Sequence, residues 1–216
     1  MNPALPNITP CRGDVGEGNR RKDGDRKLGI RKKGKSGVKK ITFVLGGARS
    51  GKSSYAVELA KRLNKEVTFI ATASRTDKEM QERIKKHRLS RPGHWKVIEE
   101  GKNISAVLSE LNNKDEVILI DCLGLFISNL MMDNLDDNEV EDRLKELIEN
   151  IKRRALSAIL VSNEVGSGIV PDNALARRFR DLLGLSNQML AKSADKVVLV
   201  QSGIPVTIKD NTESTE

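Results

Sequence analysis

Aromatic residues are scarce in this chain, where they make up only 3% of 216 residues. Proteins that bind single-stranded nucleic acids without sequence preference stack the bases on aromatic side chains, so this scarcity argues against such a partner. The two cysteines, Cys11 and Cys122, are too few for a disulfide framework. We therefore expect a protein of a reducing compartment, the cytoplasm.

Long hydrophobic runs are also missing. No apolar stretch approaches the roughly 18 residues that a membrane-spanning helix needs. The first residues lack the apolar region that marks a secretory signal. The sequence thus predicts neither membrane insertion nor secretion.

The formal net charge of +8 is unevenly distributed along the chain. Residues 1–40 contain 12 Lys/Arg and 4 Asp/Glu, so the whole basic excess lies there. The same segment has few large apolar residues and cannot bury enough surface to offset its ordering entropy. We interpret residues 1–40 as a disordered basic leader. A basic arm that contacts nucleic acid or an acidic partner is the alternative.

From residue 41 onward, short apolar runs alternate with amphipathic stretches. The runs are rich in β-branched residues, which is typical of buried strands, and span 41–45, 67–71, 117–120, 158–161, 197–200 and 206–208. The amphipathic stretches predict helices over 54–63, 78–88, 104–111, 140–154 and 174–194.

This alternation predicts one α/β domain over residues 41–209, followed by a polar tail over 210–216. We expect a P-loop NTPase fold with a mostly parallel, RecA-like sheet and helices on both faces. The last two strands are separated only by residues 201–205, which predicts a C-terminal antiparallel hairpin.

A phosphate-binding motif follows the first expected strand. The run Gly46-Gly47-Ala48-Arg49-Ser50-Gly51-Lys52-Ser53 matches G-x-x-x-x-G-K-S at every required position. Its glycines let backbone N–H groups approach a phosphate closely, and the next helix adds the positive end of its dipole. The motif predicts nucleoside triphosphate binding, with Lys52 at the β- and γ-phosphates and Ser53 at Mg²⁺.

Two polar segments follow later strands. Asp121 comes directly after the apolar residues 117–120, where an acidic residue that orients the metal is expected on a neighbouring strand. A cap for the following helix is the alternative for Asp121. Residues 162–171 form a polar cluster at a carboxyl end, where open α/β sheets bind ligands, although a plain turn would also explain them.

The two histidines, His87 and His94, lie in one segment that is dense in Lys and Arg and holds the single tryptophan. A neutral imidazole is a good nucleophile toward phosphorus, and nearby cations stabilise the charge that develops on phosphoryl oxygens. The segment therefore suits a polyphosphate. A solvated histidine on a surface helix explains His87 equally well.

Ordered motifs along the chain resemble those of one family. They are the P-loop, Ile70-Ala71-Thr72-Ala73, Glu79-Met80, Arg83-Ile84, His87-Arg88, Arg91-Pro92, Trp95, Glu99, Asp121-Cys122-Leu123, Asn129-Leu130, Asn163-Glu164-Val165-Gly166, Gly168-Ile169-Val170-Pro171, Arg177, Phe179-Arg180-Asp181, Gly184, Asn187-Gln188 and Ala194-Asp195. From about Ile41 to Lys209 the chain resembles the bifunctional adenosylcobinamide kinase / adenosylcobinamide-phosphate guanylyltransferase family of cobalamin biosynthesis.

The resemblance implies two reactions on one chain. The first phosphorylates adenosylcobinamide with ATP or GTP in the presence of Mg²⁺. The second transfers GMP from GTP to a histidine and then to adenosylcobinamide phosphate, giving adenosylcobinamide-GDP. The family forms trimers with sites between subunits, so the resemblance also implies a homotrimer.

By the same resemblance, the guanylylated histidine is His87, because it precedes Arg88 and Arg91-Pro92. Nucleotide contacts beyond the P-loop map to Thr72, Ala73, Ser74, Arg91, Pro92, Gly93, His94, Glu99 and Asp121, and the metal ligands map to Ser53 and Asp121. Two features depart from the family pattern: Gly124 stands where many members have Thr, and the basic leader has no counterpart.

Two other functions stay open from the sequence. A monofunctional small-molecule P-loop kinase would share the P-loop but form no covalent GMP intermediate. A nucleic-acid-stimulated ATPase would use the basic leader, although the low aromatic content argues against it.

Overall fold

The computed structural model of the chain describes residues 40–63, 65–73, 92–111, 116–154 and 157–211. The chain divides into two units, Met1–Gly37 and Val38–Glu216, and the structure below is that of the second. Residues 1–39 of the predicted leader (1–40), the helix expected over 78–88 and the last five residues lie outside the described residues. They stay predictions.

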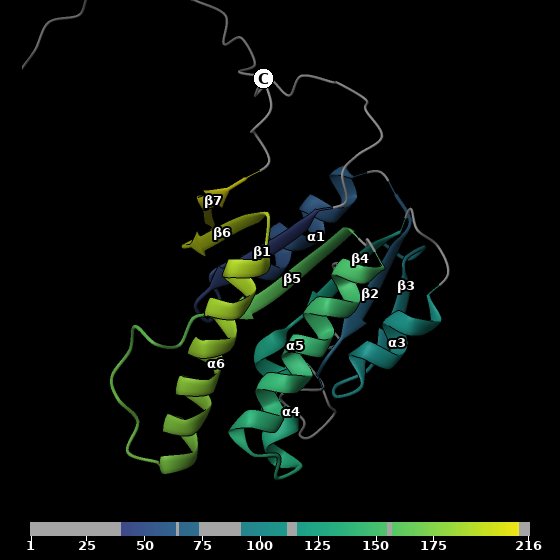
Figure 1. Ribbon diagram of the computed structural model, residues 1–216. Helices are drawn as coiled ribbons and strands as arrows, with labels where there is room; N and C mark the ends of the chain where they lie inside the picture. The colour runs from purple at the N-terminus through teal and green to yellow at the C-terminus, as the bar shows by residue number, and fades with distance from the viewer. Residues whose placement is uncertain (1–39, 64, 74–91, 112–115, 155–156, 212–216) are drawn as a thin grey trace, which may run out of the picture. The chain divides into compact units, whose positions relative to one another are not determined.

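A sheet of seven strands forms the centre of the domain. The strands are β1 (Ile41–Gly46), β2 (Val67–Ala71), β3 (Lys96–Glu99), β4 (Val117–Asp121), β5 (Ser157–Asn163), β6 (Lys196–Gln201) and β7 (Ile204–Asp210). Their order is β3-β2-β4-β5-β1-β6-β7, and only the β6–β7 pair is antiparallel (Figure 1). The predicted mostly parallel sheet with a terminal hairpin is confirmed.

Helices cover both faces of this sheet (Figure 1). One layer contains α3 (Ile104–Glu110), α4 (Leu123–Met132), α5 (Asp137–Arg153) and α6 (Ala174–Ser193), and the opposite face carries α1 (Lys52–Arg62). Successive strand residues point to opposite faces, so Phe43 packs toward α3–α6 while Val44 packs toward α1. Both faces are therefore buried, which explains the nearly continuous apolar runs of the inner strands.

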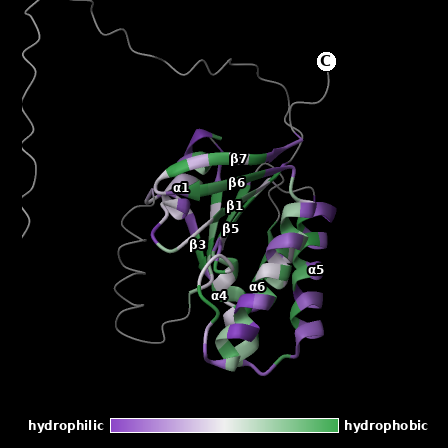
Figure 2. Ribbon diagram, turned by 90° about the vertical axis from the view of Figure 1, so that its left-hand side faces the viewer, coloured by the Kyte–Doolittle hydropathy of each residue, from purple (hydrophilic) through white to green (hydrophobic). Residues whose placement is uncertain are grey.

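Helices α5 and α6 are amphipathic, as Figure 2 shows by their mixture of hydrophilic and hydrophobic residues. The start of α5 is set by a capping box. Asp136 accepts a hydrogen bond from Glu139 N at 2.9 Å, and the Glu139 carboxylate accepts one from Asp136 N at 2.8 Å. This cap starts the helix three residues before the predicted start at Val140.

Two elements were not predicted from the sequence. Helix α4 is apolar almost all the way round, and six of its ten residues are buried, so it has no polar face to reveal a helical period. Strand β3 has four largely exposed residues at the sheet edge and lacks an apolar run. Burial determines α4, and pairing with β2 determines β3.

The turn of the β6–β7 hairpin is shorter than expected. It consists of Ser202 and Gly203, whose φ values of 52° and 81° belong to a two-residue turn with both central residues left-handed. Gly203 N donates to Ser50 O at 2.9 Å, which fastens this turn to the P-loop. Within the described residues, no helix has the length and apolar character needed to cross a membrane.

Candidate active site

The P-loop connects the end of β1 with the start of α1 at the carboxyl edge of the sheet. Arg49 and Gly51 have φ values of 56° and 92°, which turn the backbone around the loop. A Cβ added to Gly46 would collide with the side chain of Ser50 and the carbonyl oxygen of Val200. Only glycine therefore fits at the first position of the motif.

Lys52 lies inside the loop that precedes it. The residue is buried, and its Nζ donates to the carbonyl oxygen of Gly47 at 3.0 Å. The ammonium group therefore occupies the concave side of the loop, where the backbone N–H groups of a P-loop surround a phosphate.

Ser53 and Asp121 lie side by side although they come from distant parts of the sequence. Ser53 Oγ donates to Asp121 Oδ1 at 3.3 Å. The expectation that the acidic residue follows a strand adjacent to β1 is wrong, because β5 lies between β1 and β4. The predicted metal-binding pair spans this intervening strand.

A hydroxyl and a carboxylate are oxygen ligands that suit Mg²⁺, which keeps several waters and shares its shell with substrate phosphates. Among the described residues, no group of three or more His, Cys, Asp or Glu side chains forms a metal site. Ser53 and Asp121 therefore fit an ion that arrives with its nucleotide and not one held by a protein cage.

Thr72, at the end of β2, joins that strand to the end of β4. Its hydroxyl donates to Cys122 O at 2.7 Å and accepts from Cys122 N at 2.8 Å in a fully buried position. Asn129 of α4 donates to the carbonyl oxygens of Thr72 at 2.9 Å and Gly101 at 3.1 Å. Thr72 thus positions the segment next to Asp121, and the nucleotide contacts implied for Thr72 and Ala73 stay predictions.

Cys122 follows Asp121 but is not suited to covalent chemistry. Burial raises the pKa of its thiol to about 11, and the neighbouring Asp121 charge adds to the rise. The thiol therefore stays protonated at neutral pH, and a protonated thiol is a poor nucleophile.

The remaining predicted nucleotide contacts border β3. Glu99 is its last residue, and Pro92, Gly93 and His94 come shortly before its start, with His94 exposed. The proposed nucleophile His87, together with Ser74 and Arg91, lies outside the described residues. Their roles stay predictions.

The strand register separates the predicted contacts into two groups. Glu99 pairs with Ala71, and Ala71 pairs with Asp121, while Gly46 lies two strands beyond Asp121 on the other side. At about 4.8 Å per strand, Glu99 and Gly46 are about 19 Å apart across the edge, with Asp121 midway. The P-loop side and the β2–β3 side of the site therefore flank Asp121.

The polar cluster predicted after β5 lies beside the P-loop. Ser162 Oγ donates to Asn187 Oδ1 at 2.7 Å, Asn187 Nδ2 donates to Asn163 O at 3.0 Å, and Glu164 N donates to Gly46 O at 3.1 Å. Because β1 leads into α1 on one face and β5 into α6 on the other, the sheet has a switch point here, where such sheets bind ligands.

Asn187 was missed as a site-supporting residue. It lies on the inner stripe of α6, four residues after Leu183, where apolar residues otherwise face the core. A polar residue at helical spacing within an apolar stripe is the signal that would have indicated it.

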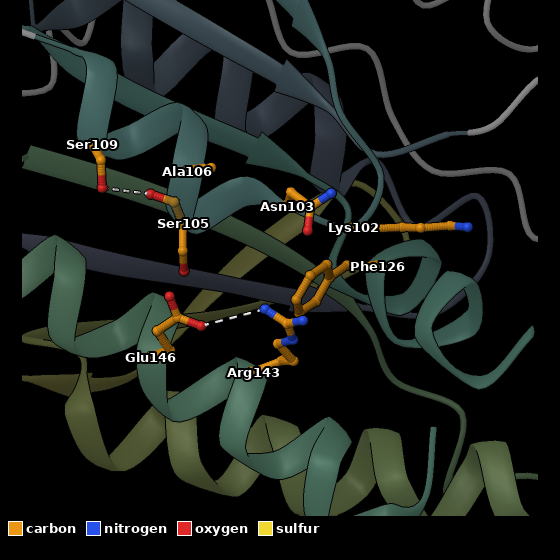
Figure 3. A pocket seen from close by; sticks show the side chains of 8 residues that line it. All are labelled: Lys102, Asn103, Ser105, Ala106, Ser109, Phe126, Arg143 and Glu146. Carbon is orange, nitrogen blue, oxygen red and sulfur yellow. Dashed lines mark hydrogen bonds and ion pairs between the residues drawn. The ribbon is translucent and has the colours of Figure 1, made fainter. Parts of the chain in front are cut away.

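Two pockets lie among the described residues near the helices and loops around the sheet. One of about 380 Å³ borders the P-loop, the end of β6 and the loop after β5. A smaller one of about 150 Å³ lies among α3, α4 and α5, where Figure 3 shows Arg143 and Glu146 paired on one side, with 3.7 Å between Nη1 and Oε2. The smaller pocket has no P-loop residue in its lining.

The comparison with known families agrees with this geometry. The family model described as cobinamide kinase / cobinamide phosphate guanyltransferase matches residues 42–208. This chain belongs to that family. The match runs from Thr42 of β1 to Ile208 of β7, which is nearly the whole sheet, and so includes both sides of the edge around Asp121.

Relatives of the cobinamide kinase / guanyltransferase family are similar over nearly their full length. The chain is 39% identical over 181 residues to the bifunctional adenosylcobalamin biosynthesis protein CobU of Escherichia coli K12, which covers 78% of this chain and 99% of the relative. The same figures hold for CobU of Salmonella typhimurium LT2. CobP of Pseudomonas aeruginosa PAO1 is 38% identical over 167 residues, or 77% of this chain and 96% of the relative.

By the resemblance of the sequence, Gly124 stands at a position where Thr is expected. It lies in the first turn of α4, and an added Cβ would be 3.6 Å from Asn163 Nδ2 and 3.7 Å from Leu183 Cδ2. These are ordinary contact distances, so packing does not require glycine here. A Cβ at this position would contact Asn163 and Leu183 without a clash.

Proposed function

We propose that this chain phosphorylates adenosylcobinamide with ATP or GTP and then transfers GMP from GTP to adenosylcobinamide phosphate, giving adenosylcobinamide-GDP. The observation that carries this proposal is the P-loop geometry, with Lys52 inside the loop and Ser53 beside Asp121. The family match over residues 42–208 and the bifunctional relatives support the same pair of reactions.

In the kinase step, the chain's main tasks are positioning and charge neutralisation, since phosphoryl transfer has little need of covalent help. Lys52 would hold the β- and γ-phosphates. Ser53 and Asp121 would hold Mg²⁺, which neutralises phosphate charge when bound. The switch point beside Asn163 would admit the acceptor hydroxyl of adenosylcobinamide.

In the guanylyl step, the imidazole of His87 would attack the α-phosphorus of GTP. A P–N bond forms, the bond to the β-phosphate oxygen breaks, and pyrophosphate leaves. A phosphate oxygen of adenosylcobinamide phosphate then attacks the same phosphorus and releases His87. Two displacements through a covalent intermediate replace one harder step. Support comes from the cation-rich segment around His87, which leads through Pro92–His94 into β3.

The proposal also includes the cellular location, the metal, the partners and the oligomeric state. We place the enzyme in the cytoplasm, with Mg²⁺ as metal and without a nucleic-acid partner, and we expect a homotrimer. Exposed apolar side chains on β7 support a subunit contact, namely Ile204, Val206 and Ile208. Mass photometry should report three times the chain mass of 23.9 kDa.

Mass spectrometry of the intact chain after incubation with GTP and Mg²⁺ tests the function. We expect one added GMP that is lost in acid and retained in alkali, as a P–N bond requires. A chain that phosphorylates adenosylcobinamide but never acquires GMP would be the monofunctional kinase, and the bifunctional proposal would then be wrong.

A further inference from the structure

The pocket beside the P-loop is built from three parts of the chain. Its floor is the loop segment 47–50, one wall is the end of β6 with Ser202 of the following turn, and the other wall contains Glu164 and Ser167. The bond from Gly203 N to Ser50 O holds the turn against the loop, so floor and wall are joined directly.

The β6 wall of the pocket lies on the side of β1 away from Asp121, whereas Glu164 and Ser167 of the other wall follow β5. The β6 wall is next to β1, whereas β4 with Asp121 lies two strands away in the opposite direction. The acceptor must approach the terminal phosphate near Lys52, Ser53 and Asp121. A nucleoside at the other end of the triphosphate would therefore extend away from Asp121, and the β6 wall of the pocket lies in that direction.

The size and chemistry of the pocket match a nucleoside. About 380 Å³ falls within the range of about 300–1,000 Å³ that small-ligand pockets have, whereas the corrin macrocycle of adenosylcobinamide is several times larger than a nucleoside. The Glu164 carboxylate would repel a phosphate but accepts hydrogen bonds from ribose hydroxyls. Gln201 and Ser202 offer both donors and acceptors to a purine edge.

The Glu164 carboxylate is held in place by the backbone. It accepts hydrogen bonds from Gly166 N at 2.5 Å and Ser167 N at 3.2 Å. Its loop is tied to the P-loop by the bond from Glu164 N to Gly46 O at 3.1 Å. The carboxylate therefore keeps a fixed distance from the phosphate-binding backbone, as a ribose contact requires.

We propose that this pocket binds the nucleoside of the phosphate donor in the kinase step. The guanine of the GTP that modifies His87 would lie at the other end of the edge, near Glu99 and Pro92–His94. The inference rests on the proposed function and adds to it two nucleoside positions that flank Asp121.

Calorimetric binding of Mg²⁺ complexes of a non-hydrolysable ATP analogue and of tripolyphosphate tests the pocket on the full chain. Gln201→Trp would fill it, and Thr207→Trp places the same bulk on an exposed position of the same hairpin. We expect Gln201→Trp to lower the affinity for the ATP analogue about tenfold, which corresponds to the loss of one or two hydrogen bonds. The affinity for tripolyphosphate should stay within about twofold of the wild-type value. Thr207→Trp should change neither affinity.

Gln201→Leu provides a second variant that removes the amide without added bulk, and should weaken only the ATP analogue. If the Gln201 variants lost the same affinity for both ligands, or lost none for either, the pocket would not be a nucleoside site. Lys52→Ala separates this outcome from failure of the proposed function, because it should weaken both ligands. If Lys52→Ala binds both ligands normally, the P-loop assignment itself fails.

Discussion

The two sides of the sheet edge around Asp121 are built in different ways. On the P-loop side, eight consecutive residues form the loop, and its turn, its lysine and its hydroxyl come from one short segment. On the β2–β3 side, Thr72, Gly101 and Asn129 are joined by hydrogen bonds between residues far apart in the chain. A phosphate can be held by a local motif because backbone N–H groups do the binding. The second side depends on long-range packing.

The largest effect is expected for His87→Ala, which tests whether His87 forms the covalent GMP adduct. His87→Ala should lose the GMP adduct and the guanylyl transfer completely but retain kinase activity, because the kinase step uses the P-loop side. His94→Ala should still form the adduct. Intact-mass measurement after GTP treatment checks both variants. An adduct retained in His87→Ala but absent in His94→Ala would move the nucleophile to His94.

The next effect tests the P-loop side. Lys52→Ala should lower adenosylcobinamide phosphorylation by about 100-fold or more, because one preorganised charged donor is removed from the phosphates. The melting temperature should change little, since the lysine nitrogen donates to a loop carbonyl, that of Gly47. Lys61→Ala, on the exposed side of the same helix, is the control and should keep normal turnover. Turnover of Lys52→Ala close to that of the control would remove the P-loop from the mechanism.

Asn129→Ala tests the β2–β3 side of the edge. It removes the donor to Thr72 O and Gly101 O, so we expect a loss of about 1–3 kcal/mol in unfolding free energy by urea denaturation. Guanylyl transfer should fall more than the kinase rate. Asn138→Ala, exposed on α5, is the matched control. If the two reactions fell equally, the two sides would not be separate functional units.

A smaller effect concerns the opposite edge of the sheet, away from the site. Burial raises the pKa of Glu116, and this effect is larger than the lowering by the nearby positive charge of Lys96. The Thr68 hydroxyl donates a hydrogen bond to the Glu116 carboxylate. The fold therefore favours the protonated acid, and this stabilisation is present below the ordinary value of 4.5 and lost as pH rises through the raised pKa.

Glu116→Gln should consequently melt about 2 °C higher than the wild type at pH 8 and show no gain at pH 4. Thermal melts across this range check the prediction, with Glu110→Gln at an exposed position as control. A gain that stayed constant with pH would mean that the charge of Glu116 is not the cause. Activity should be unaffected in either case, because neither side of the edge near Asp121 is altered.

The smallest effect is expected for deletion of residues 1–38. That segment has too little apolar surface to join a core, and the family match begins at residue 42. Melting temperature and both activities should stay within error of the full chain. A clear fall in melting temperature would show that the leader packs against the domain.

Much of the fold was predictable because the inner strands are buried on both faces. Five of the six predicted strands are apolar runs of the inner sheet, and each predicted helix that lies within the described residues is present within a few residues of its expected bounds. The exceptions have physical causes. Helix α4 is buried on nearly all sides and loses its helical period, while β3 gains its identity only from pairing with β2.

The sequence by itself determined the P-loop, the α/β class and the family, because each depends on residue types at fixed local spacing. Only the tertiary structure decided that Asp121 reaches Ser53 across an intervening strand and that Thr72 is committed to Cys122. The strand order also placed Glu99 and the P-loop on opposite sides of Asp121 along one edge. Strand order and register arise from the packing of the whole sheet, so no local pattern contains them.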